Sequence, residues 1–123
     1  MAQETYAQSV AIDYDKGQLW AKIISANYLY NINQLDTAQV LLENCLAGEY
    51  EVQPVEEFGL AYWYLGRVYR RRQDFSEADR IYGKALKAIE GIDKPYLKGS
   101  ILSDFGVTQG MQGNYPAALD YFI

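Results

Sequence analysis

The stretch AYWYLGRVYRRRQDFSEADRIYGKAL, residues 61–86, carries the pattern that decides the fold. Apolar and aromatic residues recur at helical spacing on both sides of the polar segment RRQDFS, which predicts two amphipathic helices joined by a short turn. The same stretch contains three consecutive arginines, Arg70 to Arg72, although the whole chain has a formal net charge of -5. We therefore ask what this local positive charge does in an acidic chain.

The pattern belongs to an internal repeat with a period of forty residues. Four sets of similar residues are spaced in this way: Ala38, Ala78 and Ala118; Ala26, Gly66 and Gly106; Leu42, Tyr82 and Phe122; and Leu35, Phe75 and Tyr115. Each unit reads as two helices, with the turns NINQLD, RRQDFS and QGNYP between them. Repetition at a fixed period is typical of a solenoid of stacked helix pairs.

The small residues of this repeat have a physical explanation. Where two helices cross closely, only glycine or alanine allows their backbones to approach. A glycine inside a helix costs about 0.5–1 kcal/mol relative to alanine, so a recurring one needs a packing reason. We expect Gly66 and Gly106 to lie at such crossings.

The middle unit resembles the tetratricopeptide repeat family in the motif residues Tyr62, Leu65, Gly66, Tyr69, Ala78, Tyr82 and Ala85. The third unit matches at Leu102, Phe105, Gly106, Ala118 and Phe122, with Gln109 in place of the tyrosine. The first unit matches more loosely, at Lys22, Ser25, Ala26, Leu29, Ala38, Leu42 and Cys45. The resemblance covers roughly residues 17–123 and looks like a variant with longer helices, as in bacterial regulatory and signalling proteins. It implies an all-α fold, a right-handed α-α superhelix.

We expect a single domain over residues 1–123, with repeats at 17–52, 54–92 and 94–123. The predicted helices run at about 17–32, 35–48, 54–72, 75–91, 95–112 and 116–123, preceded by a separate helix at 2–15 from an earlier repeat. The last helix ends on apolar residues without a polar cap. This pattern predicts a fragment of a longer protein, with exposed apolar surface at its C-terminal end.

Composition excludes several classes of function. The chain has no histidine and one cysteine, so it lacks the residues for a Ser-His-Asp or Cys-His nucleophile, for an ordinary zinc site and for an internal disulfide. Its acidic balance argues against nucleic-acid binding, and no long apolar run predicts a membrane span. We expect no catalytic residues, no cofactor and no metal. Without a signal-peptide pattern, the expected location is the cytoplasm.

The resemblance implies a binding groove lined by the first helix of each repeat, which in this family commonly takes a peptide or a partner helix. Carried over position by position, the candidate groove residues are Trp20, Ile23, Asn27, Tyr30, Asn31, Leu60, Trp63, Arg67, Arg70, Arg71, Ser103 and Val107. Some members of the family clamp a terminal carboxylate with Lys, Arg and Asn; only Asn27 matches that pattern here, and Ile23 stands where a lysine would be.

The arginines have two interpretations. Trp63, Arg67, Arg70 and Arg71 share one helix face, where the planar guanidinium groups suit the carboxylates of an acidic ligand. Alternatively, arginines at the end of a helix complement its dipole, and they pair on the surface with Asp74, Glu77 or Asp79. Both interpretations remain open on the sequence alone.

The predicted function is a protein–protein interaction module that binds a peptide or helix, with acidic character, as part of a larger regulatory or signalling protein. The alternative is a structural domain that forms a homo-oligomer through its terminal helices. Cys45 occupies a packing position, so we expect a buried, inert thiol.

Overall fold

The computed structural model describes residues 2–50 and 52–113, and in this part of the chain it contains five helices and no strand. The helices are α1 (Ala2–Asn31), α2 (Leu35–Ala47), α3 (Val55–Arg71), α4 (Phe75–Ala88) and α5 (Pro95–Met111). The all-α class is confirmed. Helices α2 to α5 each begin and end within three residues of the expected bounds. The helix expected at 116–123, with its apolar end, lies outside the described residues.

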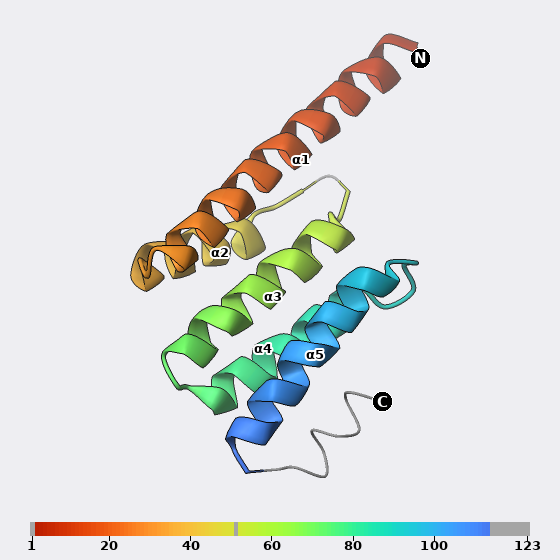
Figure 1. Ribbon diagram of the computed structural model, residues 1–123. Coiled ribbons are helices and arrows are strands. Elements are labelled where there is room, and N and C mark those ends of the chain that lie inside the picture. The colour runs from red at the N-terminus through yellow and green to blue at the C-terminus, as the bar shows by residue number, and fades with distance from the viewer. Residues whose placement is uncertain (1, 51, 114–123) are drawn as a thin grey trace.

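The helices form two layers of antiparallel neighbours (Figure 1). Helices α1, α3 and α5 run in the same direction, and α3 contacts both of the others. Helices α2 and α4 run in the opposite direction behind them; α2 packs against α1 and α3, and α4 packs against α3 and α5. The first helices of the expected repeats therefore share one layer, as the resemblance implies.

The separate helix expected at residues 2–15 is wrong, because α1 is one continuous helix of 30 residues. Gly17 lies within α1, with nothing within 4 Å of the place a Cβ would occupy. A single glycine costs a helix only about 1 kcal/mol, and no proline interrupts the pattern. The N-terminal half of α1 extends beyond the other helices in Figure 1.

The turns after α1, α3 and α5 share one geometry. Asn33, Gln73 and Gly113 each have a positive φ, of 65°, 64° and 79°, at positions forty residues apart. The N–H of Gln34 donates to the carbonyl of Leu29 at 2.7 Å, and the corresponding bond after α3 is 3.0 Å long. These bonds satisfy carbonyls at the helix C-terminus, as in a Schellman motif.

Close packing between α3 and α4 depends on Gly66. A Cβ at this position would lie 2.6 Å from the ring of Tyr82, which is completely buried. Ala78 of α4 is also completely buried beside it. The prediction that small residues lie at the helix crossing is therefore confirmed for this pair.

None of the described helices, including the long α1, has the length and apolar character needed to cross a membrane.

Candidate functional site

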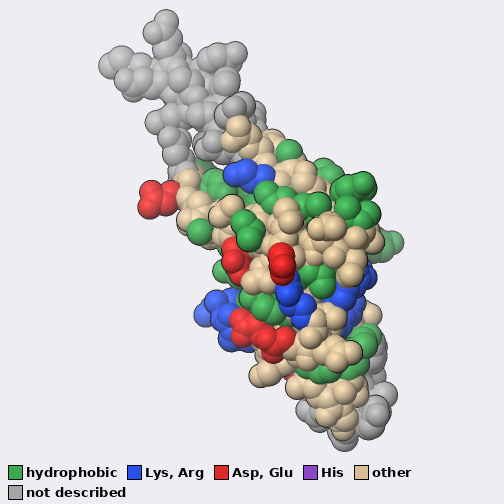
Figure 2. Space-filling model, turned by 90° about the vertical axis from the view of Figure 1, so that its left-hand side faces the viewer, with side chains coloured by type: hydrophobic (Ala, Val, Ile, Leu, Met, Phe, Trp, Pro, Cys, Tyr) green, Lys and Arg blue, Asp and Glu red, His purple; other side chains and the backbone are tan. Residues whose placement is uncertain are grey.

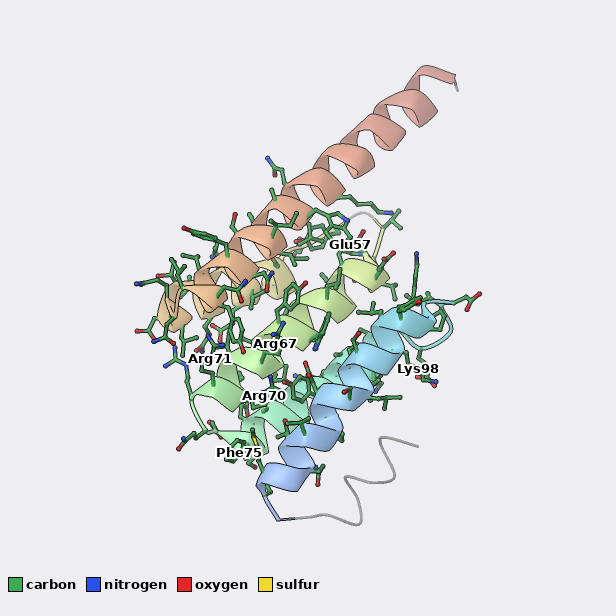
Figure 3. The ribbon with its side chains drawn as sticks, in the orientation of Figure 1. Glu57, Arg67, Arg70, Arg71, Phe75 and Lys98 are labelled. Atoms are coloured by element: carbon green, nitrogen blue, oxygen red, sulfur yellow. The ribbon has the colours of Figure 1, made fainter. Side chains whose placement is uncertain are left out.

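The surface formed by α1, α3 and α5 carries the arginines that the sequence singled out, and we call it the inner face. Its defining side chains are Trp20 and Tyr30 from α1, Trp63, Arg67, Arg70 and Arg71 from α3, and Tyr96, Ser103 and Asp104 from α5. Arg67 and Arg71 are one helical turn apart and lie between α1 and α3 in Figure 3, while Arg70 points toward α5. One helix thus presents three cations to both of its neighbours.

Asp104 of α5 connects these arginines to the neighbouring helix. Its Oδ2 accepts a hydrogen bond from Trp63 Nε1 at 2.6 Å and lies 3.9 Å from Arg67 Nε. Its Oδ1 lies 3.4 Å from Arg70 Nη1. The side chains of Asp104, Arg70 and Arg67 are 21%, 18% and 27% exposed, so water screens these charges only in part.

Tyr30 connects the same arginines to α1. The guanidinium of Arg71 lies 3.8 Å from the centre of the Tyr30 ring, and that of Arg67 lies 4.8 Å from it. Arg71 Nη1 also donates a hydrogen bond of 2.7 Å to the Tyr30 carbonyl at the end of α1. Stacking of a guanidinium on an aromatic ring is favourable, more so when water is excluded.

Arg70 is the arginine most firmly held inside the protein. Burial opposes its charge, but Tyr82, Asp104 and a hydrogen bond with Tyr30 favour the cation and raise the pKa of Arg70 above its usual value. Arg70 therefore stays charged, and its role is to hold α3 against α5 and α1. Arg71, by contrast, is exposed.

A shallow pocket of about 430 Å³ opens next to this cluster, between α3 and the first half of α5. Its lining residues are Trp63, Pro95, Tyr96, Gly99, Ser100, Ser103 and Asp104. Tyr96 stands at its edge with 93% of its surface exposed. The pocket is thus bounded by two aromatic side chains, with small residues between them.

A second tryptophan lies toward the other end of the inner face. Trp20 is 36% exposed and donates a hydrogen bond of 3.2 Å to Glu57, which is buried near the start of α3. Figure 3 shows Glu57 at this end of α3, well separated from the labelled arginines. The negative charge of Glu57 therefore lies apart from the arginine cluster.

Several predicted groove residues occupy other positions. Ile23, Tyr30 and Leu60 are buried in the core, so their side chains do not line an open groove as expected. The reason is that α1 packs closely on α3, which covers the apolar side chains at these positions. Asn27 and Val107 are half-buried, while Asn31 and Ser103 are exposed.

The expected surface partners of the arginines are also wrong. Within the described residues, Arg70 pairs with Asp104, and Arg72 pairs with Asp36 of α2. The other carboxylates have different roles: Asp74 caps α4, Glu77 pairs with Arg80, and Asp79 accepts hydrogen bonds from Gln109 and Gln112. Figure 2 shows such acidic and basic side chains next to one another across one side of the molecule.

Sequence reasoning missed Asp104. Asp104 is the one acidic residue in the α5 sequence PYLKGSILSDFGVTQGM, and α5 is the neighbour of α3, the helix that carries the arginines. The opposite charges of Asp104 and the arginines could have indicated this contact, but only if α3 and α5 were already known to be neighbours. Cys45 is buried as predicted, and burial raises the pKa of its thiol, which keeps it unreactive.

Within residues 2–50 and 52–113, no group of three His, Cys, Asp or Glu side chains is placed to hold a metal ion.

Comparison with known proteins gives one family. A family model described as tetratricopeptide repeat matches residues 57–122, which is more than half of the chain. No curated protein and no solved structure matches the chain.

Proposed function

Because the chain belongs to the tetratricopeptide repeat family, we propose that it is a protein-interaction module that holds an acidic segment of a partner protein on its inner face. Repeats of this family are typically non-catalytic and mediate contacts between proteins. A role in a larger regulatory or signalling protein is part of this proposal. The remaining question is which chemistry the inner face selects.

The observation that carries the proposal is an excess of positive charge on the inner face. Of the three arginines, Arg67 and Arg70 lie close to the carboxylate of Asp104, whereas Arg71 contacts the Tyr30 carbonyl and no carboxylate in the described residues. The cluster therefore has a charge of about +2 in a chain whose net charge is -5. An acidic segment would be attracted to this surface and repelled by most of the rest of the molecule.

The donors that reach solvent belong to Arg71, which is exposed, and to Arg67, whose side chain is 27% exposed although its Nε is buried. Each guanidinium has five N–H groups, and in the described residues Arg71 makes one hydrogen bond, to the Tyr30 carbonyl. Stacking on Tyr30 holds both guanidinium groups in place before a ligand arrives. A preorganised site loses less conformational entropy on binding. We therefore assign recognition of carboxylates to Arg67 and Arg71, and a supporting role to Arg70.

The test uses tryptophan fluorescence of a Trp20→Phe variant, in which Trp63 is the remaining reporter beside the arginines. The ligand is a short peptide of alternating Glu and Ser, with Gln replacing Glu in the control peptide. We expect saturable binding of the acidic peptide alone, weakened about tenfold or more by Arg71→Gln, since a hydrogen bond to a charged group contributes about 1.5–3 kcal/mol.

The matched control is Arg72→Gln, which removes the same charge at the end of the same helix but from a residue paired with Asp36. This variant should bind like the parent apart from a small long-range effect. Equal loss in both variants would show that general charge, not the inner face, attracts the peptide. Equal affinity for the Glu and Gln peptides would exclude recognition of acidic groups.

A further inference from the structure

The pocket bounded by Trp63 and Tyr96 lies immediately beside the arginine cluster. Resting on the proposed function, we infer that this pocket is a subsite for one large apolar side chain, preferably aromatic, of the same bound segment. The acidic group and the apolar group are then recognised together, by Arg67 and by the Trp63–Tyr96 pocket. This assignment adds a second chemical requirement to the partner.

The walls of the pocket suit an apolar group. Trp63 is half-buried and fixed by its hydrogen bond of 2.6 Å to Asp104, so its ring forms a rigid wall. Tyr96 also lines the pocket and exposes 93% of its surface, so its ring is accessible to a ligand. A side chain between the two rings would remove apolar surface of all three groups from water.

Two polar side chains of the pocket, Ser100 and Asp104, are already engaged within the protein. The Ser100 hydroxyl donates to the Tyr96 carbonyl at 2.9 Å, one turn earlier in α5. The Asp104 carboxylate accepts from Trp63 and faces Arg67 and Arg70. An apolar side chain would therefore displace water from the pocket without breaking these hydrogen bonds. A cationic side chain would gain little, because the arginines already neutralise Asp104.

The spacing of the two subsites sets the spacing in the ligand. Trp63 and Arg67 are four residues apart on α3, which corresponds to about 6 Å along the helix axis. Two residues of an extended chain span about 6.6–7 Å, and their side chains lie on the same side. We therefore expect the large apolar residue and the Asp or Glu two positions apart in an extended segment.

Gly99 provides a direct test because it lines the pocket and has open space around it. A Cβ at Gly99 would meet nothing within 4 Å, so Gly99→Leu should fill the pocket without disturbing the fold. Gly83 of α4 is the matched control: it is also helical, exposed and open within 4 Å, but it does not line the pocket. Both variants should retain the melting temperature of the parent protein or raise it.

Binding to the full chain would be measured with Ser-rich peptides that contain Phe and Glu two positions apart, in either order. Replacing Phe by Ala should weaken binding about 10- to 100-fold, the effect expected for losing one buried aromatic side chain. Moving Glu one position closer to Phe should weaken binding as well, because the two side chains then point to opposite sides. Gly99→Leu should weaken the Phe peptide about tenfold or more but leave the Ala peptide unchanged.

The outcomes separate this inference from the proposed function. If Glu matters but Phe and Gly99→Leu do not, the subsite is refuted and recognition of acidic groups stands. If Gly83→Leu weakens binding as much as Gly99→Leu, the effect is not local and the subsite is refuted. If no peptide with Glu binds, both proposals are refuted.

Discussion

Asp104→Asn tests the most important contact of the inner face. The substitution keeps the shape of the side chain, and the amide oxygen can still accept the hydrogen bond of Trp63 Nε1. It removes the negative charge that lies 3.4 Å from Arg70 and 3.9 Å from Arg67. The arginines would then repel one another without a compensating carboxylate.

The expected loss of stability follows from the partial burial of these groups. Removing one partner of a fully buried ion pair costs about 3–5 kcal/mol, whereas an exposed pair contributes about 0–1 kcal/mol. The side chains of Asp104, Arg70 and Arg67 are 18–27% exposed, so the cost of removing the Asp104 charge should lie between these limits. We therefore expect Asp104→Asn to lower the free energy of unfolding by about 2 kcal/mol.

The assay is urea unfolding followed by circular dichroism, with Asp93→Asn as the control. Asp93 is an exposed carboxylate between α4 and α5, and its loss should change stability by less than about 0.5 kcal/mol. The difference between the two variants should shrink as salt rises from 0.05 to about 1 M, where the Debye length falls to about 3 Å. Equal stability of the two variants would refute the structural role of Asp104, and a gap independent of salt would refute its electrostatic origin.

Two further substitutions test the packing and the pH dependence. Gly66→Ala should lower the free energy of unfolding by about 1–3 kcal/mol, because its Cβ would meet the Tyr82 ring at 2.6 Å; Gly83→Ala, in open space, should raise it by about 0.5–1 kcal/mol in the same urea assay. Asp79→Asn should be more stable than the parent near pH 7, with the difference vanishing below the ordinary Asp pKa. Burial raises the pKa of Asp79, so the folded state holds this proton more tightly and the parent loses stability as pH rises through that raised pKa. A difference between Asp79→Asn and the parent that stays constant with pH would contradict this assignment.

The fold was largely predictable because its pattern is local and repeated. Gly66 and Tyr82 belong to one helix pair, so a regular period in the sequence places them together without knowledge of the remaining structure. The continuity of α1 was not predictable in the same way. Gly17 and the nearby acidic residues resemble a helix end. However, a glycine destabilises a helix by only about 1 kcal/mol, which does not by itself decide whether the helix ends there.

The site was predictable only in part because its contacts join different repeats. The helix face that carries Trp63, Arg67 and Arg71 follows from spacing within α3. The partners of that face, Tyr30 and Asp104, are about forty residues away in either direction. Their role depends on how closely α1 and α5 approach α3, which a single sequence does not specify.

The structural and ligand-binding interpretations of the arginines therefore apply to different residues. Arg70 is the least exposed of the ion-paired arginines, and its charge is balanced by Asp104 of the next repeat. Arg71 is exposed and fixed by the ring and the carbonyl of Tyr30, so it is oriented without being neutralised by a carboxylate in the described residues. Arg67 contacts both groups and combines the two roles. A single internal carboxylate can thus hold the helices together while the remaining positive charge stays available for an acidic partner.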